Sequence, residues 1–375
     1  MQIALAVAAA GLLLDWRRPA RTPLDWPILA FVAVAVASDL LSRYGPPPPE
    51  FATLWRSAIG FFLVAQGLRV FADPERASLR LVFCACAGLT AAAAVGLVQY
   101  RTGVDVLYLL HLRPQQAWVE APGVEGRFGA MGFFSSRLSF GHNAAVIVSL
   151  LAGALAAGAV PVRRIWIVAG AGLLALGAIA VTFDRGAYLG LCAAAVAIAA
   201  FAAPRARKAL AVALVAAICA AALHPGVRAR FATSFSSRSN ADRVFLWTRA
   251  GEIIRDHPLL GVGFANYPRI CDRYYDRVDA NFPMRTWAHN LELSTLAEMG
   301  PLGLAALCWL LVAAALALVR SVRIRVPPLA LGGLAAAAAL LSIAQAHDVL
   351  YDTKVMFPFW FCLGLALSPA FERSS

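Results

Sequence analysis

Charged residues are scarce in this 375-residue chain: they make up 14% of the sequence, against 61% hydrophobic residues, and the mean hydropathy is +0.70. Average globular proteins carry about 25% charged residues. A soluble domain with far fewer charged residues than this could not bury all of its apolar surface. The apolar residues also form blocks of roughly 17 to 22, the length that a helix needs to cross a bilayer. This composition excludes a soluble enzyme and predicts an all-α polytopic membrane protein.

Lysine is nearly absent as well, because only two of the 33 basic residues are lysine and the rest are arginine. The net charge of +12 would suggest a nucleic-acid partner if the protein were soluble. Here the arginines lie in the gaps between apolar blocks and in one long loop, as expected where a chain meets anionic lipid. We therefore predict the lipid bilayer, and no nucleic acid, as the partner of these charges.

Several chemical motifs are missing. The seven cysteines include no Cys-x-x-Cys pair, and the six histidines include none with metal-ligand spacing, so we predict neither a disulfide framework nor a metal ion. The sequence also lacks a Walker loop, a Gly-x-Gly-x-x-Gly turn and a Gly-x-Ser-x-Gly elbow. Nucleotide hydrolysis and serine hydrolase chemistry therefore have no support, and we predict no cofactor.

The apolar blocks predict about eleven spanning helices in a single membrane domain, residues 1–375. The predicted spans are 1–14, 26–42, 51–71, 79–100, 138–158, 163–182, 186–203, 208–223, 300–319, 328–346 and 350–368. We take the first block as a span and not as a signal peptide, because no basic residue precedes it. Arginine-rich short loops alternate along the chain and are assigned to the cytoplasm. The loops 101–137 and 224–299 then lie on the outer side.

The longer outer loop is predicted to contain a helix over 242–257, which Asp242 caps and Pro258 ends. Leu246, Ile253 and their apolar neighbours form a stripe at helical spacing, so this helix is expected to lie on the membrane or on the bundle. Arg249 falls on the solvated face, whereas Arg243 projects on the apolar side.

Three segments along the second half of the chain occur in the order of a known family. His289-Asn290 is followed, after nine intervening residues, by Gly300-x-x-Gly303 at the mouth of a span. The segment Arg185–Leu189 reads Arg-x-x-x-Leu at an outer helix end, and Arg243 opens a helix and turn that run to Gly263. Together they resemble the O-antigen ligase and polymerase superfamily, which includes bacterial protein O-oligosaccharyltransferases. The resemblance covers residues 130–368.

This resemblance implies a fold of twelve helices with a long extracytoplasmic helical loop, so one helix is expected to be missing here from the N-terminal part. It also implies transfer of a glycan from undecaprenyl pyrophosphate to an acceptor in the periplasm, at the bacterial inner membrane. We expect an inverting and metal-independent enzyme of the O-antigen ligase type, which joins O-antigen to lipid A core.

The residue types suit such a transfer. A leaving pyrophosphate gathers negative charge, which guanidinium forks stabilise in bidentate fashion, so Arg185 and Arg243 are predicted to bind it. A neutral histidine suits a base at neutral pH, and His289 is predicted to take the proton of the acceptor hydroxyl. Asn290, Arg137 and Arg249 are possible supporting residues.

Each of these residues has a structural alternative. Arg185 could be an interfacial anchor at a helix end, and Asn290 could cap the helix that follows it. His142-Asn143, at the start of a span, could line the same outer cavity, but capping and packing are the favoured interpretation. The polar group His347, Asp348, Asp352 and Lys354 lies at the edge of the last span, where polar residues are functional by default, although Asp352 and Lys354 could simply pair.

Other functions remain open at this point. Within the family, a polymerase would extend a carrier-bound repeat, and an oligosaccharyltransferase would glycosylate serine or threonine. A lipid or polysaccharide transporter would need buried acids and repeated halves, of which the sequence shows little. A metal-dependent transferase would need paired acidic residues in an early outer loop. Asp105, with Glu120 and Glu125, is a weak candidate for such a site.

Overall fold

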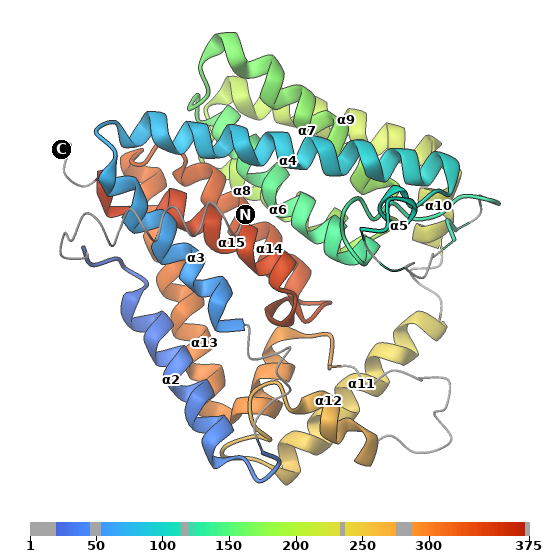
Figure 1. Cartoon of the computed structure of the whole chain (residues 1–375), viewed down its shortest axis with the longest axis vertical. Helices are drawn as coiled ribbons and strands as arrows, with labels where there is room; N and C mark the ends of the chain where they lie inside the picture. Colours follow the sequence, from blue (N-terminus) through green and yellow to red (C-terminus); the bar gives the residue numbers. More distant parts are fainter. Residues whose placement is uncertain are drawn as a thin grey trace.

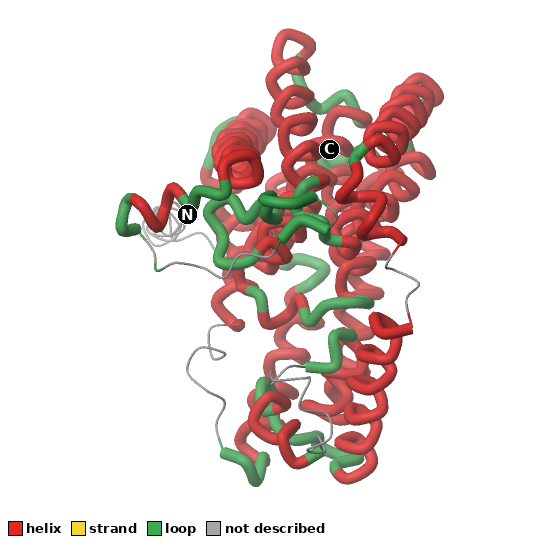
Figure 2. Tube along the Cα trace, turned by 90° about the vertical axis from the view of Figure 1, so that its right-hand side faces the viewer, coloured by secondary structure: helices red, strands yellow, loops and turns green. Residues whose placement is uncertain are grey.

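The computed structural model describes residues 20–45, 54–112, 114, 120–122, 124–232, 237–274 and 287–371. Within these residues the protein is all-α, and its one β contact is an isolated bridge between Glu120 and Phe128. Figure 2 accordingly shows helices and loops alone in the described part of the chain. The predicted fold class is confirmed, while the predicted span 1–14 lies outside the described residues.

The helices follow the predicted order. They are α2 (Asp25–Leu41), α3 (Leu54–Gly67), α4 (Pro74–Thr102), α5 (Val106–Leu109), α6 (Arg137–Ala156), α7 (Ile165–Ala180), α8 (Arg185–Phe201), α9 (Pro204–Leu223), α10 (Pro225–Ala232), α11 (Ser237–Asp256), α12 (Tyr267–Ile270), α13 (Leu291–Ile324), α14 (Ala330–Ala344) and α15 (Thr353–Ala366). Figure 1 places α7 and α9 at one end of the longest axis, α11 and α12 at the other, and α14 and α15 between them.

Five described segments are long and apolar enough to cross a membrane. They are Pro74–Thr102, Arg137–Ala156, Val162–Ala180, Leu291–Ile324 and Thr353–Phe371. Three shorter apolar helices accompany them, namely Ser57–Val70, Arg185–Phe201 and Ala330–Ala344. The protein therefore has the character of a multi-pass membrane protein, and the total of about eleven spans stays a prediction.

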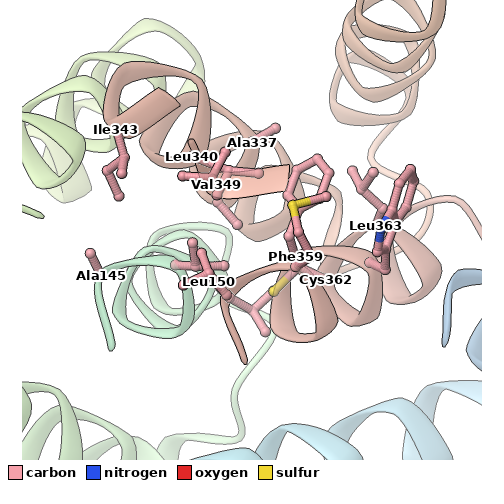
Figure 3. Packing of buried hydrophobic residues seen from close by; sticks show 14 of the residues in the cluster. Ala145, Leu150, Ala337, Leu340, Ile343, Val349, Phe359, Cys362 and Leu363 are labelled. Atoms are coloured by element: carbon pink, nitrogen blue, oxygen red, sulfur yellow. The ribbon is translucent and has the colours of Figure 1, made fainter. Parts of the chain in front are cut away.

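Small residues allow α14 to lie at the centre of the bundle. This helix packs against both α6 and α8. Figure 3 shows apolar side chains of α6, α14 and α15 packed in one cluster, among them Leu150, Leu340 and Cys362. A Cβ on Gly153 of α6 would lie 2.5 Å from the Cα of Gly332, so these two backbones touch. Close approach at glycine and alanine is how helices gain contact area in lipid, where burial of apolar surface gives no driving force.

The loop after α11 turns back onto α13 through backbone contacts. Val262 N donates to Ala297 O at 3.0 Å, and Gly263 N donates to Glu298 O at 2.9 Å. The helix α11 begins at Ser237 and not at Asp242, so the predicted start was wrong, while its end at Asp256 agrees with the prediction. A capping residue type marks a possible start, but the residues before Asp242 also tolerate helix, and the helix extends through them.

Gly300 bends α13 where the loop meets it. Its φ of 64° lies in the left-handed region, and a Cβ added there would lie 2.2 Å from Leu259 O. We expect Gly300→Ala to lower the free energy of unfolding by roughly 2 to 5 kcal/mol, because strain and overpacking add. The loss of stability can be measured as a decrease in melting temperature in detergent. Gly88→Ala, in open space on α4, serves as the control and should not lower the melting temperature.

Candidate active site

His289 lies in the short link before α13, with its backbone in an uncommon conformation. Its φ is 51°, in the left-handed region that residues with a side chain rarely adopt, and such strain gathers at functional sites. The next residue, Asn290, caps α13 by accepting from Leu293 N at 2.9 Å. The structural alternative for Asn290 is therefore what the geometry shows.

Asp348 holds His289 in place. Its Oδ2 accepts from the His289 backbone N at 2.9 Å and also lies 2.9 Å from His289 Nδ1. Its Oδ1 accepts from Ser294 Oγ at 2.6 Å, so the carboxylate is fixed from both sides. A carboxylate beside Nδ1 favours the tautomer that leaves Nε2 as the proton acceptor. The His289 side chain is 41% exposed, whereas Asp348 is 5% exposed, so the base faces the solvent and its partner does not.

A second histidine–aspartate group lies beside this pair. His142 Nε2 is 2.9 Å from Asp184 Oδ2, and His347 Nε2 is 3.9 Å from Asp184 Oδ1. The ring of His347 lies between the other two histidines, with centroids 4.6 Å from His142 and 6.0 Å from His289. The prediction that His142 serves packing or capping therefore missed its contact with a buried carboxylate.

Two glycines make room for this second group. A Cβ on Gly186 would lie 2.9 Å from His347 Cδ2 and 3.2 Å from His142 Nε2. A Cβ on Gly141 would lie 3.0 Å from Asp184 Oδ2. The backbones of α6 and α8 thus reach the ring atoms and the carboxylate directly, which fixes where these side chains can lie.

The charges of this group follow from its surroundings. Burial and the neighbouring His142 lower the pKa of His347 to about 3, so this imidazole is neutral at physiological pH. Burial alone would raise the pKa of Asp184, but His142, His347 and the Gly186 N–H hold it below its usual value. Asp184 therefore keeps its negative charge across the physiological range.

His142, Asp184 and His347 could also hold a metal ion, because one ligand atom from each lies within 4.8 Å of the others. Two imidazoles and a carboxylate are ligands that Zn²⁺ accepts. The arginines around this group act against a further positive charge in their midst. The predicted absence of a metal stays a prediction.

Four arginines from four helices gather on the other side of Asp184. Arg137, Arg230 and Arg243 each interact electrostatically with Arg185. Arg137 Nη1 donates to Thr182 O at 2.8 Å and to Phe183 O at 3.1 Å, and Arg230 Nε donates to the same Phe183 O at 3.2 Å. These bonds fix the turn that carries Asp184 and Arg185. We call Arg137, Arg185, Arg230 and Arg243 the arginine group.

The structure brings most of the predicted residues together. Arg243 acts electrostatically on His347, so the arginine group and the histidines form one continuous site. Arg230, which had not been singled out, joins the group because α10 follows α9 directly. Arg249 lies further along α11, and its Nη1 donates to both oxygens of Glu252, at 2.9 and 2.8 Å. Its charge is therefore offset within its own helix.

Glu298 is a buried carboxylate that sequence reasoning had not singled out. It accepts from Ala265 N at 2.9 Å, from Tyr267 N at 3.1 Å and from Trp287 Nε1 at 3.0 Å, and the Tyr351 hydroxyl donates to it as well. The rings of Trp287 and Tyr351 stack with centroids 4.4 Å apart. Trp287 lies two residues before His289, and Tyr351 lies three residues after Asp348. Glu298 thus links the chain segments that flank the His289–Asp348 pair.

Two other predicted polar groups have local roles. Asp352 caps α15 through Lys354 N at 3.0 Å and accepts from Ser139 Oγ, while the Lys354 ammonium donates to Ser135. The expected pairing of the Asp352 and Lys354 side chains is not what their described contacts show. Asp105 caps the short helix α5 through Leu107 N at 3.2 Å.

Part of the site lies within a stretch that matches a known family. Residues 170–308 match the family model described as O-antigen ligase. The resemblance to the O-antigen ligase superfamily is thereby confirmed. The matched stretch contains Asp184, Arg185, Arg230, Arg243 and His289, whereas Arg137, His142, His347 and Asp348 lie outside it. This family is one of glycosyltransferase-like enzymes, which transfer glycans in the manner of O-antigen ligases. No match is found among curated proteins.

Proposed function

We propose that this protein transfers a glycan from undecaprenyl pyrophosphate to lipid A core on the periplasmic side of the bacterial inner membrane. The observation that carries the proposal is the arginine group beside the His289–Asp348 pair, of which Arg185, Arg230, Arg243 and His289 lie within the stretch that matches the O-antigen ligase family. The loops 101–137 and 224–299 of a single membrane domain, residues 1–375, would then face the periplasm. The enzyme acts without a cofactor, and no metal ion takes part in bond breaking.

The chemistry follows from these groups. His289 Nε2 takes the proton of the acceptor hydroxyl, whose oxygen attacks the anomeric carbon while the bond to the pyrophosphate breaks. The leaving pyrophosphate gains negative charge, which Arg185 and Arg243 stabilise by charge-assisted hydrogen bonds. Attack opposite to the leaving group inverts the anomeric configuration. Arg137 and Arg230 support the Arg185 guanidinium by fixing the turn at Phe183.

The arginines provide the first test. In liposomes that contain a radiolabelled donor and lipid A core, Arg185→Ala and Arg243→Ala should each lower kcat/KM roughly 10²–10³-fold, the loss typical of one transition-state donor. Arg249→Ala is a matched control on the same helix as Arg243, and it should cost far less because Glu252 offsets its charge. Equal losses for all three variants would contradict the assignment of the pyrophosphate site.

The product identifies the acceptor class. Transfer to core supports a ligase, lengthening of the lipid-linked glycan would make the enzyme a polymerase, and label on serine or threonine would make it a protein O-oligosaccharyltransferase. Movement of the donor across the bilayer without any transfer would favour a lipid or polysaccharide transporter.

A further inference from the structure

Asp184 lies where the histidines and the arginine group meet. Its side chain is 2% exposed, and it contacts His142 at 2.9 Å and His347 at 3.9 Å. Its Oδ1 also accepts from Gly186 N at 2.9 Å, which caps α8 at the helix end that begins with Arg185. Asp184 therefore contacts the two histidines and also the first turn of α8, which carries Arg185 of the arginine group.

The negative charge of Asp184 also stabilises the arginine group. The four guanidinium groups of the arginine group repel one another, and Asp184 interacts favourably with both Arg137 and Arg185. A buried carboxylate is stable when positive charges and hydrogen-bond donors surround it, and here both surround it. The arrangement keeps the anion-binding arginines together before an anion arrives.

We propose that Asp184 is a positioning residue for glycan transfer, which holds His142 and His347 on one side and Arg185 on the other, so that the arginine group keeps a fixed place beside His289. The proposal rests on the proposed function. It differs from a purely structural role, in which Asp184 would only cap α8. Asp184 touches no substrate, and it acts through the residues that it holds.

Asp184→Asn separates these two roles. Asparagine has nearly the same size and caps helices as well as aspartate does, so the cap on α8 stays, while the negative charge is lost. We expect the melting temperature to change by only a few degrees and kcat to fall at least tenfold. The KM for the donor should stay the same or fall, because the site becomes more positive. Asp73→Asn is the matched control, since Asp73 caps α4 through Arg76 N and shows no histidine contact among the residues that the structure describes, and it should leave kcat unchanged.

Gly186→Ala probes the same geometry by steric means. The added Cβ would lie 2.9 Å from His347 and 3.2 Å from His142, so the His347 ring must shift and the His142 ring must give by a few tenths of an ångström, which disturbs their contacts with Asp184. Alanine is otherwise the better helix residue, so a loss of kcat could not come from helix propensity. We expect kcat to fall at least tenfold here too, and the double variant with Asp184→Asn to lose little more than the worse single variant.

The outcomes are distinct. If the wild type transfers no glycan, the proposed function fails and the role of Asp184 fails with it. If the wild type transfers glycan and Asp184→Asn matches it in kcat, the positioning role alone is overturned. A stoichiometric transition metal in the purified wild type, measured by mass spectrometry and lost in Asp184→Asn, would also overturn it, because the carboxylate would then serve a cation. A metal-free wild type with a selective loss of kcat in Asp184→Asn supports it.

Discussion

Replacing His289 with alanine is expected to lower kcat for glycan transfer roughly 10²–10⁴-fold, the contribution of a positioned general base. The acceptor hydroxyl would lose the group that takes its proton, while the arginine group that binds the donor would stay intact. The KM for the donor should therefore change little. The liposome assay with radiolabelled donor measures both constants.

The matched control for this variant is His111→Ala. His111 also has a positive φ, of 55°, and it is exposed in the loop 101–137, so it tests the removal of a histidine from the same backbone conformation. Its kcat should equal that of the wild type. Asp348→Asn should approach the effect of His289→Ala, because the amide cannot favour the productive tautomer. Full activity in His289→Ala would remove this residue from the chemistry.

Replacing Glu298 with alanine is expected to lower the free energy of unfolding by about 3 to 5 kcal/mol, because several hydrogen-bond donors would each lose their acceptor, at a cost of about 1 to 3 kcal/mol per unsatisfied buried group. Two backbone N–H groups, the Trp287 indole and the Tyr351 hydroxyl would lose their acceptor inside the protein. Unsatisfied buried donors are expensive because water cannot reach them. Thermal melting in detergent should show a decrease of roughly 5 to 10 °C.

Glu292→Ala is the matched control for Glu298→Ala. Glu292 lies six residues earlier on the same helix, and its Oε1 accepts one exposed bond from Gln345 Nε2 at 3.0 Å. Its removal should cost about 1 kcal/mol or less, the net value of one ordinary hydrogen bond. If the two variants melt at the same temperature, the four contacts of Glu298 contribute little to stability.

The sequence was sufficient for the parts of the fold that depend on local pattern. Blocks of apolar residues marked α4, α6 and α7 within a few residues, because a helix satisfies its own backbone hydrogen bonds in lipid and needs little from its neighbours. The start of α11 was less predictable, since several residues near it can begin a helix. The spacing of His289-Asn290 from Gly300 pointed to the site because the whole motif is local.

The contacts that complete the site could not be read from spacing. Asp184 meets His142 and His347 across 42 and 163 residues of chain, and Asp348 meets His289 across 59. Such pairs depend on how α6, α8 and α14 pack, which no local pattern specifies. The one available signal was the rarity of polar residues at the ends of apolar blocks, which marked the segment after α14 without naming its partners.

Both histidine–aspartate groups depend on two adjacent residues in the link that follows α14. His347 faces Asp184 and its neighbour Asp348 faces His289, so a single peptide bond separates the two points of attachment. An insertion or deletion of one residue between Ala344 and this pair would rotate both side chains away from their partners together. The connection between α14 and α15, although a loop, therefore has a fixed length, unlike most loops, which accept changes in length freely.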